Sequence, residues 1–334
     1  MVAMTTETET PTTTLGRSGL EVSRIAFGTW QLGGDWGSFD EREASDAIRH
    51  AHEVGINFFD TAQAYGFGGS ERLLGGALRD PLRSERDRLV IATKGGLRMD
   101  EEAGLVRDSS ADWIRRGVEA SLGTLGIERI DLYQIHWPDP DTPLAETAAA
   151  LKQLVDEGKV AHVGVSNFDA GQMAEFARVR PVETLQPPYH LFRREVEDEI
   201  LPYCTANDIG VLVYGPLAHG LLTGAIDEGT KFGADDWRSK SEIFQGETLR
   251  RNLEVVARLD ELARRRGCRL SQLAIAWTLA NRAVDVAIVG TRSAAHIEEA
   301  VAGADIELTD GELAEIDRVM DDATPAPGPT PDSV

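Results

Sequence analysis

Four polar residues of this chain, Asp60, Tyr65, Lys94 and His136, could together polarise a carbonyl group and hand it a proton. They occur in the segments FFDTAQAY, VIATK and LYQIH, at the ends of apolar, strand-like runs. Taken singly, each has a structural explanation, because an aspartate after a strand often forms a turn and a histidine beside apolar residues often lies in the core. Their occurrence together at successive strand ends favours catalysis instead.

The elements that must position these residues alternate between β-rich runs and amphipathic helical patterns. Several runs are continuously apolar, which is typical of strands covered on both faces in a parallel sheet. The predicted strands lie near residues 24–30, 56–62, 88–94, 130–137, 160–166, 182–189, 210–215 and 284–290. The predicted helices lie near residues 41–54, 110–125, 144–157, 169–179, 195–207, 250–266, 271–282, 293–303 and 310–320. This alternation predicts an α/β fold of the (β/α)8 TIM barrel type.

Two further segments complete the predicted single barrel domain, which spans residues 14–322. The segment LGRSGLEVS at 15–23 predicts an N-terminal β-hairpin that plugs the bottom of the barrel. The stretch 224–249 is long and polar, and loops of this length are often lids, so we expect it over the C-terminal face. Residues 1–13 are expected to form a disordered arm, and residues 323–334 a disordered Pro-rich tail.

Almost every predicted strand delivers a polar side chain to the C-terminal rim, where barrel enzymes build their active sites. Asp60, Lys94 and His136 end the second, third and fourth strands. The fifth to seventh strands end with Ser166, Asn167, Gln186 and Tyr214. The sequence therefore predicts one polar site at this rim.

Composition restricts the partners of the chain. A formal net charge of −22 over 334 residues disfavours nucleic acid and anionic membrane surfaces. No apolar run reaches the roughly 18–20 residues of a transmembrane helix, and the N-terminus lacks the features of a signal peptide. We therefore expect a cytoplasmic protein in which local basic residues and backbone amides hold any phosphate-bearing cofactor.

No metal site or disulfide is predicted. Cys204 and Cys268 provide neither a disulfide framework nor zinc-ligand spacing. His50 and His52 lie two residues apart within the first predicted helix and so face different sides of it.

The chain resembles the aldo-keto reductase family in motifs that follow the family's order over residues 15–320. The matching segments are GTW, FFDTAQAYG, SERLLG, ATK, IDLYQIHWPDP, KVAHVGVSNF, LQPPY, YGPLAHGLLTG and IVGTRS. Two stretches, LYQIHWPDP and LQPPYHLF, are most similar to bacterial reductases of the general-stress or inositol-catabolism type. The resemblance implies an oxidoreductase that reduces small aldehydes or ketones to alcohols with NADPH, or the reverse, with NADH also possible.

The resemblance also implies a role for each of the four polar residues. Tyr65 would be the general acid in reduction and the base in oxidation. A phenol ordinarily titrates near about pH 10, and the ammonium of Lys94 would favour its phenolate form. Asp60 would hold Lys94 charged, and His136 would orient the substrate carbonyl.

In this family the cofactor lies extended across the barrel mouth without a Rossmann unit. In agreement, the segment GFGGSE at 66–71 has Glu71 where the third glycine of a dinucleotide fingerprint belongs. The positions that match the nicotinamide end are Thr29, Trp30, Asp60, Ser166, Asn167, Gln186 and Tyr214, of which Tyr214 would stack on the ring. The pyrophosphate would meet Gly215, Pro216 and Leu217, because backbone amides often bind phosphate. Arg238 could clamp a phosphate or be a solvated loop residue.

The adenosine end would be held by the segment after the last strand, at Gly290, Thr291, Arg292, His296 and Glu299. Arg292 could pair with a 2′-phosphate. His296 stands where many relatives have Arg or Gln, and Ala300 where many have Asn, which weakens an inference of strict NADP specificity.

Trp30, Phe67 and Trp137 would line the substrate pocket or, alternatively, pack at its rim. Two other functions remain open on the sequence. One is a lyase of the same fold that uses Lys94 as a Schiff-base nucleophile. The other is a cofactor-binding regulatory subunit, since channel-associated relatives keep this fold. The paired Asp60 argues against the first, and the intact Tyr65, Lys94 and His136 argue against the second.

Overall fold

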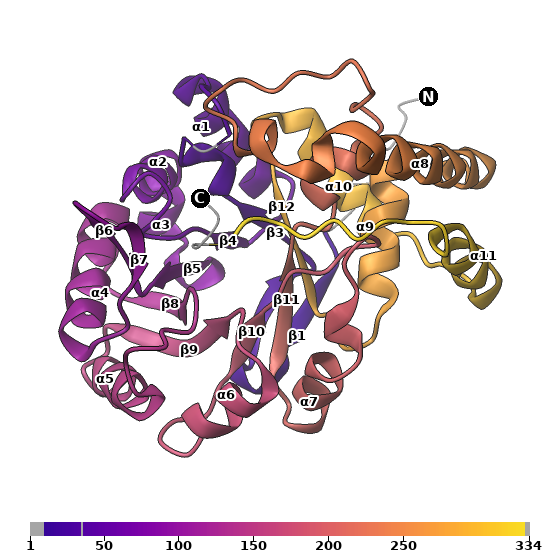
Figure 1. The fold of residues 1–334 in the computed structure, drawn as a ribbon. Coiled ribbons are helices and arrows are strands. Elements are labelled where there is room, and N and C mark those ends of the chain that lie inside the picture. Colours follow the sequence, from indigo (N-terminus) through magenta and orange to yellow (C-terminus); the bar gives the residue numbers. More distant parts are fainter. Residues whose placement is uncertain (1–9, 35, 331–334) are drawn as a thin grey trace, which may run out of the picture.

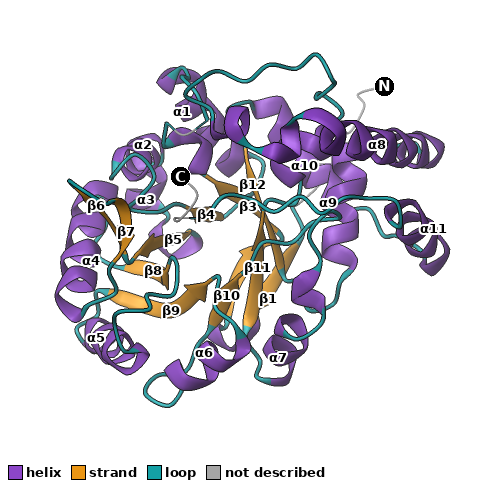
Figure 2. Ribbon diagram, in the orientation of Figure 1, coloured by secondary structure: helices purple, strands orange, loops and turns teal. Residues whose placement is uncertain are grey.

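The computed structural model describes residues 10–34 and 36–330. Eight parallel strands close into a barrel, surrounded by helices, as Figures 1 and 2 show. The barrel strands, in their order around it, are β3 (Ile25–Gly28), β4 (Phe58–Asp60), β5 (Val90–Gly95), β8 (Ile130–Ile135), β9 (Val160–Ser166), β10 (Thr184–Gln186), β11 (Gly210–Tyr214) and β12 (Val286–Gly290). The predicted (β/α)8 barrel is confirmed.

The helices that cover the barrel agree with most of the predicted ranges. They are α1 (Glu41–Glu53), α2 (Gly69–Ala77), α3 (Arg79–Ser84), α4 (Ala111–Leu125), α5 (Leu144–Asp156), α6 (Ala170–Phe176), α7 (Ile200–Ala206), α8 (Gly246–Arg266), α9 (Leu270–Ala280), α10 (Ala294–Ala304) and α11 (Asp310–Met320). Side chains cap the starts of α1, α4, α6 and α11. In α11, Thr309 and Glu312 form the expected capping box. The helix predicted over 195–207 is instead a 3-10 turn at Glu195–Glu197 followed by α7.

Four elements have no counterpart in the predicted pattern. Helices α2 and α3 fill the connection between β4 and β5. An antiparallel hairpin, β6 (Leu97–Asp100) and β7 (Gly104–Arg107), follows β5. Other 3-10 turns lie at Gly16–Ser18, Trp30–Leu32, Arg86–Arg88, Ala218–Thr223, Trp237–Lys240 and Glu242–Phe244.

The N-terminal hairpin consists of β1 (Thr12–Leu15) and β2 (Leu20–Ser23), and it closes one end of the barrel. Leu15 and Val22 are fully buried and belong to the apolar cluster inside the barrel, with Phe58 and Leu212. Gly16 has a φ of 47°, and a Cβ there would lie 2.1 Å from the backbone nitrogen of Gly210. The hairpin can therefore approach the barrel floor this closely only because residue 16 has no side chain.

The chain beyond α11 follows a defined path as far as residue 330, although a disordered tail was expected there. The amide of Ala326 donates to the carbonyl of Phe192 at 3.0 Å, and Ala326 is buried. Asn252 bonds Thr324 twice, donating to its carbonyl at 3.0 Å and accepting from its amide at 2.9 Å. In Figure 1 this yellow segment runs from α11 across the barrel. At the other end, Thr12 and Thr13 lie in β1 although they were assigned to the disordered arm; residues 1–9 and 331–334 lie outside the described residues, and the limits 14–322 stay a prediction.

Candidate active site

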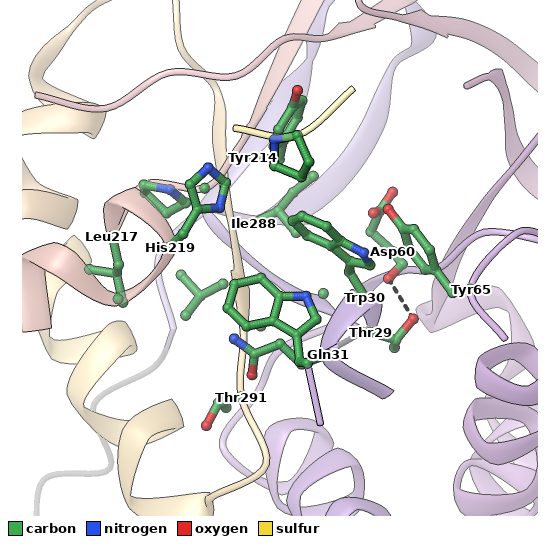
Figure 3. A pocket seen from close by; sticks show the side chains of 18 of the residues that line it. Thr29, Trp30, Gln31, Asp60, Tyr65, Tyr214, Leu217, His219, Ile288 and Thr291 are labelled. Atoms are coloured by element: carbon green, nitrogen blue, oxygen red, sulfur yellow. Dashed lines mark hydrogen bonds between the residues drawn. The ribbon is translucent and has the colours of Figure 1, made fainter. Parts of the chain in front are cut away.

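A cavity of about 1020 Å³ opens at the C-terminal ends of the strands. Its lining includes every residue predicted for the site except Lys94, which is fully buried and contacts Asp60 and Tyr65. Figure 3 shows Asp60 and Tyr65 on one side of this cavity, Trp30 at its centre, and Thr291 at another end. This volume lies at the upper end of the range for pockets that hold drug-sized ligands. It therefore suits a large ligand such as a dinucleotide together with a small substrate.

Asp60, Lys94 and Tyr65 form a contiguous buried group. Lys94 Nζ donates to Asp60 Oδ1 at 2.6 Å, to the carbonyl of Thr61 at 2.9 Å and to Tyr65 Oη at 3.3 Å. The side chain of Lys94 is 0% exposed, and that of Asp60 is 3% exposed. Burial lowers the pKa of Lys94 from its ordinary value, while the charge and hydrogen bond of Asp60 oppose this change. The ammonium is thus held between a carboxylate and a phenol, which is the arrangement that the resemblance implied.

The second oxygen of Asp60 is held by two glutamines. Oδ2 accepts from Gln186 Nε2 at 2.9 Å and from Gln134 Nε2 at 3.3 Å. Gln134 was not among the predicted residues, although a glutamine within the apolar run of β8 is a signal for a polar group inside the barrel. Because both oxygens have partners, the carboxylate cannot rotate away from Lys94 without breaking hydrogen bonds.

His136 completes the group from the end of β8. Its ring lies edge-on to Tyr65, with centroids 5.5 Å apart, and its backbone carbonyl accepts from Asn167 Nδ2 at 3.1 Å. Within the described part of the chain, its Nδ1 is buried without a hydrogen-bond partner. Burial, and secondly the charge of Lys94, lower the pKa of His136 well below its ordinary value. A neutral imidazole therefore faces the cavity beside the phenol.

The residues expected at the nicotinamide ring lie together at the ends of β9, β10 and β11. Tyr214 Oη donates to Asn167 Oδ1 at 2.9 Å, and Asn167 Nδ2 donates to Ser166 Oγ at 3.0 Å. Ser166 Oγ in turn donates to the carbonyl of Gln186 at 2.8 Å. Asn167 has a φ of 62°, a conformation that asparagine tolerates better than most residues. These donors and acceptors suit a carboxamide, and the ring of Tyr214 faces the same space.

Aromatic side chains from three loops pack over this part of the cavity. Trp30 stacks with Tyr65 at 6.4 Å and with Trp237 at 6.1 Å between centroids. It also meets Trp36 edge-on at 5.0 Å and His219 edge-on at 6.0 Å. Trp36, Trp237 and His219 were not predicted, because nothing in their local sequence shows which loops meet. Thr29, which was predicted, lines the cavity and bonds the carbonyl of Asp60 at 3.2 Å.

The long loop expected at 224–249 ends at Gln245, because α8 already begins at Gly246. It lies beside the cavity, and its Trp237 and Arg238 line it. Arg238 forms an ion pair with Asp236 at 2.6 Å, donates to the carbonyl of His219 at 3.2 Å and lies over the ring of Trp36 at 4.6 Å. It is therefore not a freely solvated loop residue. Gly215, Pro216 and Leu217 line the cavity nearby, where the pyrophosphate was expected.

The predicted adenosine end also lines the cavity, through Gly290, Thr291, Arg292, His296 and Glu299. Arg292 donates to the backbone carbonyls of Gln31, Trp36, Gly37 and Ser38. The role at a 2′-phosphate that the resemblance implied for it stays a prediction. Arg269 and Ser271 lie in the same lining and were not predicted. A basic residue just before a helix is common, so nothing in the local sequence indicates that Arg269 lines a cavity.

The expected substrate walls, Trp30, Phe67 and Trp137, line the cavity. The unpredicted β6–β7 hairpin adds apolar side chains beside them, including Met99, which is 58% exposed. Phe67 is 48% exposed. These exposed apolar groups at the mouth suit a small organic substrate better than a strongly charged one.

Comparisons with known proteins agree with this geometry. The sequence profile of the Aldo/keto reductase family matches residues 24–321. The chain is 43% identical to Aldo-keto reductase YhdN of Bacillus subtilis (strain 168) over 86% of each chain. It is 35% identical to the NADH-specific methylglyoxal reductase of Escherichia coli (strain K12), over 89% of this chain and 94% of that protein.

A solved structure is similar in fold and sequence. The glycerol dehydrogenase AKR11B4 from Gluconobacter oxydans superposes with a TM-score of 0.83 at 39% identity, covering 93% of this chain and 95% of that chain. A further relative, Aldo-keto reductase yakc (NADP(+)) of Schizosaccharomyces pombe, is 32% identical over 94% of this chain and 92% of that protein. No helix within the described residues is long and apolar enough to cross a membrane.

Proposed function

This chain belongs to the aldo/keto reductase family and is an NAD(P)H-dependent oxidoreductase that reduces carbonyl groups, and we propose that Tyr65 is its proton donor. The observation that carries this role is the contact of Lys94 Nζ with both Asp60 and Tyr65 inside the barrel. NAD(P)H supplies the hydride. The side chains then have to place the carbonyl, deliver one proton and stabilise the charge that remains.

In reduction, the hydroxyl of Tyr65 gives its proton to the carbonyl oxygen as that oxygen becomes an alkoxide. The phenolate left behind lies beside the ammonium of Lys94, which lowers the energy of the charged product. Asp60 keeps Lys94 protonated in a site where burial alone favours its neutral form. In oxidation the same phenolate takes the proton from the alcohol, by microscopic reversibility.

His136 is proposed to orient the substrate. Because its imidazole is neutral, one ring nitrogen can donate a hydrogen bond to the carbonyl oxygen without competing with Tyr65 for the proton. Ser166, Asn167 and Gln186 are proposed to hold the cofactor carboxamide, and Tyr214 to stack on its ring. The support is that all four line the same cavity as Tyr65.

The finer identity is also a proposal. We infer that the chain is a bacterial reductase of the general-stress or inositol-catabolism type, acting in the cytoplasm on a small carbonyl compound. The motifs LYQIHWPDP and LQPPYHLF and the similarity to the Bacillus protein support this type. Relatives named for methylglyoxal and glycerol make small polar carbonyls and alcohols the first substrates to test.

The experiment that tests the catalytic role is Tyr65→Phe, assayed through the absorbance of the reduced nicotinamide with a panel of aldehydes, ketones and sugars. Removing the hydroxyl should lower kcat by at least about 100-fold, because positioned proton transfer contributes about 10²–10⁴. Cofactor affinity should change little. Near-normal turnover by this variant would show that another group donates the proton.

The lyase alternative is disfavoured by the same contacts. A Schiff-base lysine must lose its proton to attack, whereas Lys94 is paired with Asp60 at 2.6 Å and fully buried. Borohydride trapping in the presence of a carbonyl substrate is expected to give no adduct on Lys94, and an adduct would overturn the assignment.

A further inference from the structure

Three arginines line the cavity within the described residues, and one of them could bind the extra phosphate that distinguishes NADPH from NADH. They are Arg238, Arg269 and Arg292. A 2′-phosphate needs a cation that can turn toward it at little cost. The hydrogen bonds of each guanidinium therefore decide which one is available.

Arg292 is fully engaged in holding a loop. Its Nη2 donates to the carbonyls of Gln31 at 2.6 Å, Gly37 at 3.1 Å and Trp36 at 3.2 Å. Its Nε donates to Gln31 at 3.1 Å, and its Nη1 donates to Ser38 at 3.3 Å. Turning to a phosphate would break the bonds to four backbone carbonyls, three of which are part-buried, so the side chain serves as the anchor of the loop between β3 and α1.

Arg238 is engaged in a similar way, with a buried partner. Asp236, whose side chain is 7% exposed, accepts from Nε and from Nη2, at 3.0 and 2.6 Å. The remaining nitrogen, Nη1, donates to the carbonyl of His219. Breaking this pair would leave Asp236 buried without its cation, which is costly.

Arg269 is different because it is mostly in solvent. Its side chain is 76% exposed, and its Nη1 forms an ion pair with Glu299 Oε2 at 2.7 Å. The other oxygen of Glu299 accepts from the hydroxyl of Ser271. Such an exposed pair contributes little to stability, so Arg269 can exchange Glu299 for another anion at small cost. Glu299, 17% exposed, keeps Ser271 as a partner.

We propose that Arg269, at the start of α9, binds the 2′-phosphate of NADPH, and that Glu299 competes with the phosphate for its guanidinium. The proposal rests on the use of a nicotinamide cofactor described above. With NADH, which lacks the 2′-phosphate, Arg269 keeps its ion pair with Glu299. The protein would thus accept both cofactors, with the balance set by the ion pair between Arg269 and Glu299.

The test is Arg269→Ala, with dissociation constants for NADPH and NADH measured by calorimetry. Loss of a hydrogen bond to a charged group corresponds to roughly tenfold or more in affinity, so NADPH should bind at least about 10-fold more weakly. NADH should change by less than about twofold. The same difference is expected for adenosine 2′,5′-bisphosphate against adenosine 5′-monophosphate, which isolates the adenosine end from the catalytic residues.

Two variants make the comparison sharper. Glu299→Gln frees Arg269 and should strengthen NADPH relative to NADH, which is the opposite direction. Arg265→Ala is the matched control, because Arg265 is an exposed arginine paired with Glu315 that does not line the cavity. This control removes the same charge from the protein and should leave the NADPH to NADH ratio unchanged.

Several results would overturn the proposal. Equal losses for both cofactors in Arg269→Ala, or no loss, would remove its phosphate role. So would a selective loss of NADPH in Arg292→Ala, which is expected instead to weaken both cofactors and lower Tm. If the wild-type protein binds neither nucleotide, the proposed function fails along with this inference, whereas tight NADH binding without phosphate discrimination refutes only the inference.

Discussion

Replacing Asp60 by asparagine removes the charge that faces Lys94 while keeping the size of the side chain. Two unit charges 2.6 Å apart interact by about 6 kcal/mol at an effective dielectric constant of 20. Lys94 can escape part of that loss by giving up its proton, because burial already lowers its pKa. For a lysine of ordinary pKa, about 10.4, deprotonation at pH 7 costs about 4.6 kcal/mol. We therefore expect Asp60→Asn to lower the free energy of unfolding by about 3–5 kcal/mol at pH 7.

The pH dependence separates this electrostatic cost from a packing defect. A lysine whose pKa is lower in the folded than in the unfolded state binds more protons when the protein is unfolded. Between these two pKa values the free energy of unfolding therefore rises with pH. Removing Asp60 depresses the pKa of Lys94 further and extends that window to lower pH. The deficit of Asp60→Asn should therefore shrink between pH 7 and about pH 10, with a slope of at most about 1.4 kcal/mol per pH unit.

The assay is urea unfolding of both proteins at several pH values, with Asp131→Asn as the control. Asp131 is also buried, and it pairs with Arg86 at 2.8 Å, but an arginine keeps its proton throughout this range. The control should lose stability by an amount that does not depend on pH. A deficit of Asp60→Asn that is equally flat from pH 7 to 10 would falsify the view that Asp60 acts by holding Lys94 charged.

Two other predictions concern the neutral His136 and the N-terminal β1–β2 hairpin. Burial and the charge of Lys94 lower the pKa of His136 well below its ordinary value, so kcat/KM for reduction should show no loss that titrates near pH 6.5. His136→Gln should give the same pH profile in this range at a lower rate. An inflection near pH 6.5 that vanishes in the variant would contradict this. Gly16→Ala should destabilise the protein by about 1–3 kcal/mol or more, because φ is 47° and the new Cβ would meet the backbone of Gly210. Gly19→Ala is the control: its φ is 67°, but no atom lies within 4 Å of the new Cβ, so it should lower Tm less. Equal Tm losses in the two variants would refute the steric reason.

The barrel could be predicted because its strands are local signals. Apolar runs such as VIATK and IDLYQIH identify buried parallel strands, and the rule that barrel sites lie at strand ends then places Asp60, Lys94 and His136 together. The same rule places Ser166, Gln186 and Tyr214 at this rim, because they also end strands. Their role at a nicotinamide ring was implied by the resemblance to the family and stays a prediction. The sequence therefore predicts well where residues at the ends of barrel strands lie.

Loops carried the information that was missed. The hairpin β6–β7 and the meeting of Trp30, Trp36 and Trp237 depend on contacts between segments far apart in the chain, and no local pattern encodes them. The tail at 323–330 was expected to be disordered from its proline content, which reports only that it forms no helix or strand. Its hydrogen bonds to Asn252 and Phe192 are tertiary contacts that composition cannot show.

The two ends of the cavity differ in how firmly their charges are fixed. At the catalytic end, Gln134 and Gln186 hold one oxygen of Asp60, the other oxygen holds Lys94, and Lys94 reaches Tyr65, so each polar group restricts the next. This end is preorganised, and a substitution in it should affect every substrate alike. At the adenosine end the ion pair of Arg269 is open to solvent and can be exchanged. On the proposal that Arg269 binds the 2′-phosphate, selection among cofactors can change at that end by single substitutions without disturbing the proton-transfer group.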